Sequence, residues 1–127
     1  MRAWTGILLL GGLLIGSAPG AQAAERGDAE RGRVIFNGKG ICYYCHGTDG
    51  RPDQRPQLSE ETMKVITRLA PNPPDLRNSK QLKLKSDRDR FRIIREGHTG
   101  SGMLPDRTLT DQEIADALAY VVSLRGR

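Results

Sequence analysis

Residues 40–47 read Gly-Ile-Cys-Tyr-Tyr-Cys-His-Gly, and this short stretch decides what kind of domain the chain builds. It holds both cysteines of the 127-residue chain, Cys42 and Cys45, followed at once by His46. Two thiols at this spacing can each form a thioether with one of the two vinyl groups on one edge of a porphyrin. The adjacent imidazole can then supply an axial ligand to the iron. C-x-x-C-H therefore predicts the covalent attachment of a c-type haem.

Two other interpretations of the cysteine pair fit the rest of the sequence less well. A thioredoxin-like redox pair requires a βαβ context, and the sequence pattern shows none. A surface disulfide or half of a zinc site leaves the adjoining His46 without a role, and the chain has no second cysteine pair. Two cysteines also exclude a disulfide-dense scaffold. Haem attachment is the interpretation that uses all three residues.

The composition is that of one globular domain. With 28% charged and 37% hydrophobic residues in a chain of 127, the sequence is too polar for a protein with several membrane spans. Its 20 Lys and Arg residues outnumber its 15 Asp and Glu residues, which gives a formal net charge of +5. A mildly basic surface favours acidic partners without selecting nucleic acid.

The N-terminus predicts export from the cytoplasm. Residues 1–23 comprise one positive charge, an apolar run over 7–15 and an A-x-A cleavage signature at 21–23. We interpret them as a cleaved secretory signal peptide and residues 24–127 as the domain. The alternative is an uncleaved membrane anchor, but the strongly apolar run is shorter than the roughly 20 residues that a span requires. The expected location is the periplasm, where the protein should not meet nucleic acid.

Helix start and stop patterns recur along the domain, whereas no stretch alternates polar and apolar residues as a half-buried strand does. The sequence therefore predicts an all-α domain of about four short helices. The first runs from Ala29 to Phe36 behind the N-cap Asp28. Each of the other three follows a hydroxyl N-cap: Ser59 with Pro71 beyond the helix end, Ser86 with Gly97 at the end, and Thr110 with Glu113 completing a capping box.

These helices supply few large side chains for a core. The domain contains five aromatic residues, and long loops join its helices. Since a domain of this size buries only an intermediate fraction of its surface, a large apolar cofactor at its centre would make up the deficit. The five aromatics are Phe36, Tyr43, Tyr44, Phe91 and Tyr120.

Residues 25–127 resemble the class I c-type cytochromes, the monohaem cytochrome c family. The resemblance rests on five features in order: a short N-terminal helix, C-x-x-C-H-G at 42–47, a proline-containing loop ending in Leu76, a methionine followed closely by proline at 103–105, and a C-terminal helix with Ala-Tyr-Val at 119–121. It implies a helical fold around one covalently bound haem c. It also implies a carrier that passes single electrons between redox proteins and is not an enzyme.

The resemblance implies a role for each of five residues. Cys42 and Cys45 hold the haem, His46 is the proximal iron ligand, and Met103 is the distal ligand. The carbonyl of Pro74 accepts a hydrogen bond from the second ring nitrogen of His46 and so fixes the tautomer of the ring.

The resemblance also implies that the terminal helices cross, with Gly32 and Phe36 on the first helix and Tyr120 on the last. Gly32 stands in the middle of a predicted helix, where glycine costs about 1 kcal/mol relative to Ala. Close approach of another backbone at Gly32 is one explanation, and a simply tolerated glycine is the other.

The distal side departs from the family pattern. Leu104 stands between Met103 and Pro105, where the family often has Met-Pro directly. His98, in the same glycine-flanked loop, is the alternative distal ligand. Met63, the only other methionine of the domain, falls on the apolar stripe of the second helix, which indicates a core position. If no side chain binds the iron there, an open site could bind a gas or a peroxide.

A basic segment over residues 77–95 bears on the choice of partner. It holds eight Lys and Arg residues against two acidic residues. In the family, basic residues near the exposed haem edge dock acidic redox partners, so the resemblance implies partners with acidic docking surfaces. The alternative is a solvated helix face. The eight basic residues are Arg77, Lys80, Lys83, Lys85, Arg88, Arg90, Arg92 and Arg95.

The expected assembly state is a monomer that shuttles between partners. It would meet a membrane only through a partner complex or an uncleaved signal segment. The alternative is a fixed subunit of a respiratory or dehydrogenase complex, in which the same haem chemistry serves one partner permanently.

Overall fold

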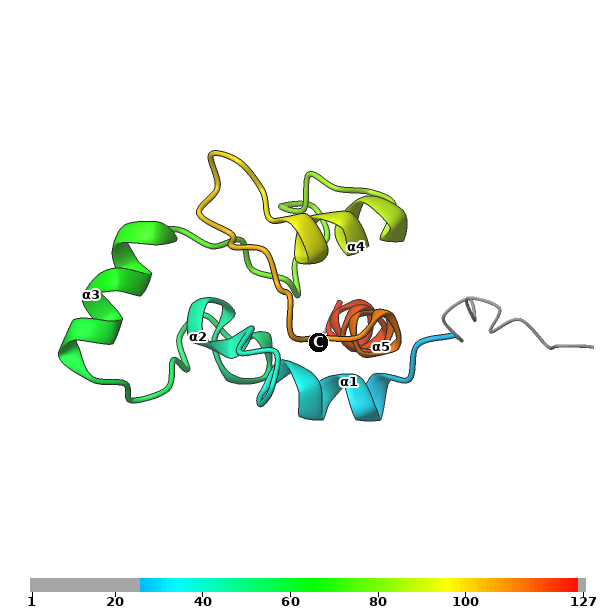
Figure 1. Ribbon diagram of the computed structural model, residues 1–127, viewed down its shortest axis with the longest axis horizontal. Coiled ribbons are helices and arrows are strands. Elements are labelled where there is room, and N and C mark those ends of the chain that lie inside the picture. Colours follow the sequence, from blue (N-terminus) through cyan, green and yellow to red (C-terminus); the bar gives the residue numbers. More distant parts are fainter. Residues whose placement is uncertain (1–25, 126–127) are drawn as a thin grey trace, which may run out of the picture.

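The computed structural model describes residues 26–125, and these residues form five α-helices and one 3₁₀ turn (Figure 1). Within this range there is no strand, and the only β-type pairing is an isolated antiparallel bridge between His98 and Met103. The all-α prediction is confirmed. In chain order the elements are α1 (Ala29–Phe36), α2 (Tyr43–His46), η1 (Thr48–Gly50), α3 (Glu60–Leu69), α4 (Asp87–Glu96) and α5 (Asp111–Ser123).

The four predicted helices begin where their N-caps place them. The Asp28 carboxylate accepts from the Arg31 N–H at 2.8 Å, and the Ser59 and Ser86 hydroxyls each accept from the backbone N–H three residues on. Thr110 and Glu113 form the reciprocal capping box at the start of α5. These side chains satisfy N–H groups that a helix cannot pair internally, so local sequence sets each start.

Two further elements, α2 and η1, were not predicted. Both are short and lie within and directly after the C-x-x-C-H segment. Gly47 ends α2 at a φ of 79°, and a Cβ placed on it would lie 1.7 Å from the carbonyl oxygen of Arg51. Only glycine fits this turn, because a positive φ and a backbone contact coincide there.

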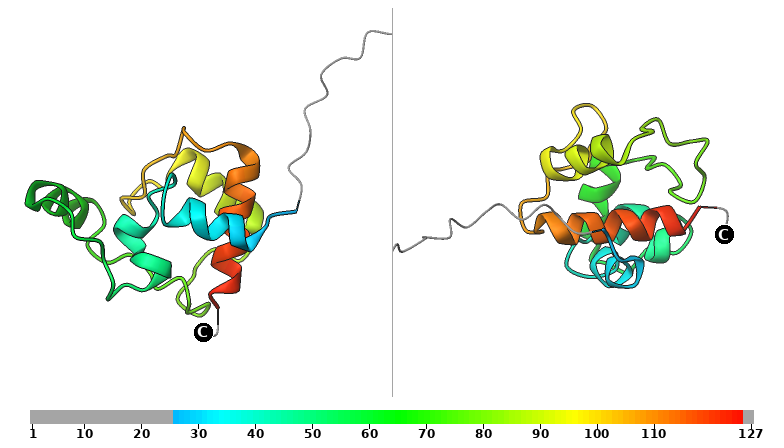
Figure 2. Two further views of the ribbon diagram at one scale, coloured as in Figure 1. Left: turned by 90° about the horizontal axis from the view of Figure 1, so that it is seen from below. Right: turned by 90° about the vertical axis from the view of Figure 1, so that its right-hand side faces the viewer.

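The terminal helices cross steeply, and α5 lies between α1 and α4 (Figures 1 and 2). At the α1–α5 crossing a Cβ on Gly32 would lie 1.9 Å from the carbonyl oxygen of Asp116. Gly32 is therefore required for close approach, which decides between the two explanations given above. The rings of Phe36 and Tyr120 meet edge to face, with centroids 5.5 Å apart. The predicted crossing of Gly32, Phe36 and Tyr120 is confirmed.

Two clusters of buried apolar residues form the core, and both involve α5. Phe36, Tyr120 and Leu124 make one; Leu109, Ile114 and Leu118 make the other, with Phe91 and Ile94 of α4 against it. Helix α3 belongs to neither cluster and packs instead near α2, away from α5 (Figure 1). Met63 on α3 is only half-buried, so it is not the buried core residue that the sequence predicted. On this helix the buried residue is Ile66.

None of the helices within residues 26–125 is long and apolar enough to cross a membrane. The predicted signal peptide, residues 1–23, and the first two residues of the predicted domain lie outside the described residues.

Candidate haem-attachment site

Helix α2 brings the three residues of the C-x-x-C-H pattern together on about one turn, with Cys42 as its N-cap and His46 as its last residue. The cysteines are not joined to each other by a disulfide. The Cys42 side chain packs against the cluster of Phe36, Tyr120 and Leu124, and burial raises the pKa of its thiol to about 12. Burial also raises the pKa of Cys45. Burial thus favours the neutral thiol at both positions, and Cys42 is the one held against the crossing of the terminal helices.

The His46 side chain is half-buried, with its Nδ1 atom shielded from solvent. Burial lowers its pKa below the ordinary value, and the backbone carbonyl of Pro74 opposes that change. Its Nδ1 atom is buried without a hydrogen-bond partner of normal geometry. The structure thus brings the Pro74 loop to the His46 ring, as expected, while the hydrogen bond to Nδ1 is not completed. A buried ring nitrogen without a partner is costly in a protein core and is typical of a functional site.

The segment enters and leaves α2 through unusual backbone conformations. Ile41 has a φ of 47°, which a β-branched residue rarely adopts, and Gly47 follows the helix at a φ of 79°. Leu76, at the end of the proline-containing loop, packs with Cys42 against the first core cluster. Residues on both sides of the attachment segment therefore help to hold it in place.

Sequence reasoning missed a hydrogen-bond network centred on Asp49. Its carboxylate accepts two hydrogen bonds from the guanidinium of Arg33, at 2.9 and 2.8 Å, one from Asn37 and one from the Tyr120 hydroxyl. These donors hold the pKa of Asp49 well below its usual range, with Arg33 contributing most. Asp49 has a φ of 54°, so the turn depends on this network. The only local clue in the sequence is Asp49-Gly50, a turn pair.

Met103 lies in a tight loop over residues 97–105. The N–H of His98 donates to the carbonyl of Met103 at 3.0 Å, so the two possible distal ligands are backbone neighbours across the loop. His98 is exposed, and Met103 has 36% of its surface exposed to solvent. The backbone alone does not separate the two ligand assignments.

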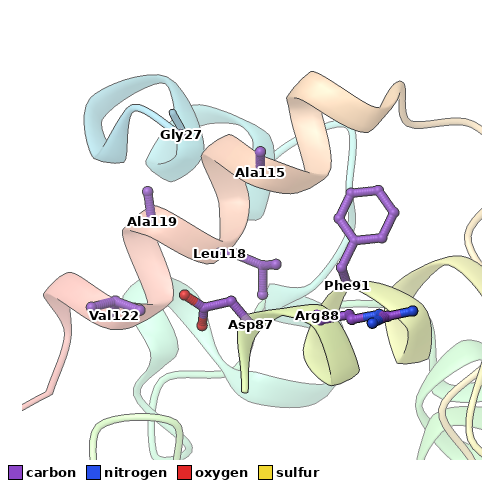
Figure 3. Close-up of a pocket in the computed structure, with 8 residues that line it drawn as sticks. All are labelled: Gly27, Asp87, Arg88, Phe91, Ala115, Leu118, Ala119 and Val122. Carbon is purple, nitrogen blue, oxygen red and sulfur yellow. The ribbon is translucent and has the colours of Figure 1, made fainter. Parts of the chain in front are cut away.

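An open cleft of about 550 Å³ lies elsewhere, between α4, α5 and Gly27, two residues before α1 (Figure 3). In Figure 3, Leu118 of α5 points toward α4, whose residues Asp87, Arg88 and Phe91 line the other side of the cleft. No residue of the attachment segment or of the Met103 loop lines this cleft. It is separate from the site.

The residues present fit a covalently bound haem. Two unpaired thiols share one turn with a half-buried imidazole whose buried Nδ1 is unpartnered, and an all-α scaffold holds that turn near the crossing of its terminal helices. Fold and site define a helical protein built around a covalent prosthetic group. The chain belongs to the cytochrome c family: the family model described as Cytochrome c matches residues 29–125. No curated protein and no solved structure matched the chain.

Family membership confirms the prediction of a class I c-type cytochrome and of haem c as the cofactor. The family binds one iron in a haem held through cysteines, and Cys42 and Cys45 are the only two in this chain. The protein is therefore a haem-based electron-transfer protein. The family also implies redox partner proteins.

Proposed function

We propose that the protein is a monohaem carrier that passes single electrons between redox proteins outside the cytoplasm, and that it is not an enzyme. The observation that carries the proposal is the single turn of α2, which holds Cys42, Cys45 and His46 together. When bound, the haem supplies a one-electron ferric–ferrous couple. The two cysteines hold it by thioethers, and His46 supplies one axial ligand.

Met103 supplies the second axial ligand in this proposal. A thioether ligand raises the reduction potential. The backbone bond between His98 and Met103 closes the loop that carries this ligand. With both axial positions filled by side chains, no substrate needs to bind the iron. Pro74 keeps its proposed part as the carbonyl that orients the His46 ring.

One observation favours a second candidate function. Protein contacts leave Met103 partly exposed, and Leu104 separates it from Pro105. If this loop does not deliver the sulfur, the distal side is open and the protein binds a gas or a peroxide. His98, paired with Met103 through the backbone, is the other side chain that could fill the position.

The basic segment supports partners with acidic docking surfaces. Four of its eight basic side chains pair with carboxylates of their own chain. Among residues 26–125 no ion pair is found for the other four, which are all exposed and carry the net positive field that would attract an acidic partner. Electron transfer needs only a brief contact through a small interface. These four are Lys80, Lys83, Lys85 and Arg88.

We further propose that residues 1–23 are a cleaved signal peptide and that the protein works in the periplasm as a monomer. The composition of this segment supports export. Contact with a membrane then occurs only through a partner complex, or directly if the segment is retained, and nucleic acid is not a partner. A fixed subunit of a respiratory or dehydrogenase complex would instead co-purify with its partner in constant ratio.

The absorption spectrum of the matured protein, ferric and ferrous, tests the carrier proposal. A c-type spectrum with the weak long-wavelength ferric band of methionine sulfur, together with no binding of carbon monoxide by the ferrous protein at neutral pH, is the expected result. A c-type spectrum with rapid carbon monoxide binding would instead establish the open-site function. Absence of covalent haem after expression with a working cytochrome maturation system would contradict both the carrier function and the open-site function.

A further inference from the structure

The loop that carries Met103 is tied to α4 at its base. The N–H of Asp106 donates to the carbonyl of Ile94 at 2.8 Å, and the guanidinium of Arg95 donates to the carbonyl of Leu109 at 2.8 Å. Above this base, the His98–Met103 backbone bond closes the loop. The base is therefore fixed. At the tip, residues 99–102, Ser101 donates to the His98 carbonyl through its N–H and its hydroxyl, so these bonds shape the turn but do not tie it to another element.

The end of α3 meets the tip of this loop. A Cβ placed on Gly102 would lie 1.6 Å from the carbonyl oxygen of Leu69 and 2.5 Å from its carbonyl carbon. Leu69 is the last residue of α3, and Ala70, which follows it, is buried. Backbone therefore touches backbone at this point, and no other residue type fits between them.

Gly102 directly precedes Met103, so this contact limits where the Met103 backbone can lie. The Met103 side chain is not in either core cluster and is 36% exposed, so packing of the side chain does not hold it. Helix α3 itself belongs to neither core cluster and lies near α2, which carries the haem-attachment residues. It therefore connects the attachment segment to the loop of the second ligand.

We propose that α3 positions Met103, with Gly102 as the positioning residue at the contact with Leu69. The inference rests on the proposed function, in which Met103 is the distal iron ligand. This proposal gives a role to the segment over residues 52–71. The backbone at the end of α3 contacts the loop at Gly102 and limits the positions that the Met103 sulfur can take. Without the contact between Leu69 and Gly102, the His98–Met103 bond would still close the loop, but the position of Met103 would vary.

Gly102→Ala tests the proposal, and Gly100→Ala is its matched control. Both glycines have a positive φ, 73° at Gly102 and 84° at Gly100, so alanine carries a similar backbone cost at either position. A Cβ at Gly100 meets nothing within 4 Å, whereas at Gly102 it collides with Leu69. The two variants therefore differ in the contact and not in the strain.

The readouts are the methionine band of the ferric holoprotein, its reduction potential and its thermal unfolding midpoint. We expect Gly102→Ala to lose most of the band, to have a lower potential and to lose more of its unfolding midpoint, while Gly100→Ala keeps the band and the potential and loses only what the backbone strain costs. An unchanged band in both variants, or an equal loss in both, would overturn the proposal. Met103→Ala distinguishes the failures, because a band that survives this change removes Met103 as ligand and overturns the proposed function and the positioning role together.

A second pair of variants covers the case in which Gly102→Ala yields no holoprotein. Ile66→Ala removes a buried side chain of α3 without changing any residue of the loop, and Val65→Ala shortens its neighbour, which is 54% exposed. Loosening α3 should weaken the methionine band and speed carbon monoxide binding in the first variant only. Equal spectra and binding rates in the two variants would show that α3 does not position the ligand.

Discussion

The hydroxyl of Tyr120 in α5 donates a 2.8 Å hydrogen bond to Oδ1 of Asp49, which lies three residues after His46 and 71 residues before Tyr120. The same carboxylate accepts a bidentate pair of bonds from Arg33 of α1. One side chain thus ties the haem-attachment segment to both terminal helices. The segment owes its position to the helix crossing as well as to its own turn.

Tyr120→Phe should destabilise the holoprotein by about 1.5 kcal/mol, the usual contribution of a hydrogen bond to a charged group. The ring packing against Phe36 is kept, so the loss reports the hydroxyl. Denaturant unfolding of the single variant, of Asp49→Asn and of the double variant measures the coupling. If the double variant loses the sum of the unfolding free energies lost by the two single variants, the bond between Tyr120 and Asp49 does not contribute to stability.

Gly32→Ala should destabilise the protein by about 3 kcal/mol or more, because its methyl would overlap the Asp116 carbonyl and force α1 and α5 apart. Val34→Ala on the same helix is the control, since Val34 is 75% exposed and a surface change costs within about 0.5 kcal/mol. Unfolding midpoints of the two variants test the prediction. Comparable midpoints would mean that the crossing adjusts without cost.

Asp116 should make stability fall in acid. It is 3% exposed, and bonds from the Arg31 guanidinium, the Asp28 N–H and Gln112 lower the pKa of its carboxyl to about 2. Since this pKa is below the unfolded value, the carboxylate stabilises the fold by about 2 kcal/mol above pH 4, and the contribution is lost as pH falls from about 4 to 2.

Unfolding free energy measured over that pH range checks the prediction. Asp116→Asn should lower stability at neutral pH and flatten the fall between pH 4 and 2. Asp53→Asn, at an exposed carboxylate, should keep the full fall. A variant at position 116 with the same acid dependence as the parent protein would contradict the assignment.

Met103→Ala and His98→Ala together identify the distal ligand. We expect Met103→Ala to remove the methionine band, lower the reduction potential and admit carbon monoxide to the ferrous protein. His98→Ala should leave all three unchanged, because His98 is an exposed loop residue. If His98→Ala changes the spectrum, the potential and carbon monoxide binding while Met103→Ala does not, His98 is the distal ligand.

Cys42→Ala and Cys45→Ala should each leave one thioether, and His46→Ala should abolish the native low-spin spectrum. Mass spectrometry of the matured protein and haem staining under denaturing conditions measure the attachment. Cys42→Ala should destabilise the fold more than Cys45→Ala, because only Cys42 packs against the cluster of Phe36, Tyr120 and Leu124. Equal unfolding midpoints would contradict that difference.

Much of the fold could be predicted because helix starts depend on neighbours in sequence. The N-caps Asp28, Ser59, Ser86 and Thr110 act within three residues, and all four bond as expected. The C-x-x-C-H spacing is likewise local, and it identified the cofactor. The short turns α2 and η1 escaped prediction because glycines and contacts with distant residues, as at Gly47 and Asp49, hold them.

The amino-acid sequence by itself determined the four longer helices, the candidate haem-attachment residues and the basic segment, because each depends on residue types a few positions apart. Only the tertiary structure decided that Gly32 is needed at a helix crossing, that Asp49 joins three segments, and that Gly102 rests on Leu69. Those contacts join residues between 16 and 84 positions apart. No local propensity encodes such pairs, since they form only when packing brings distant backbone together.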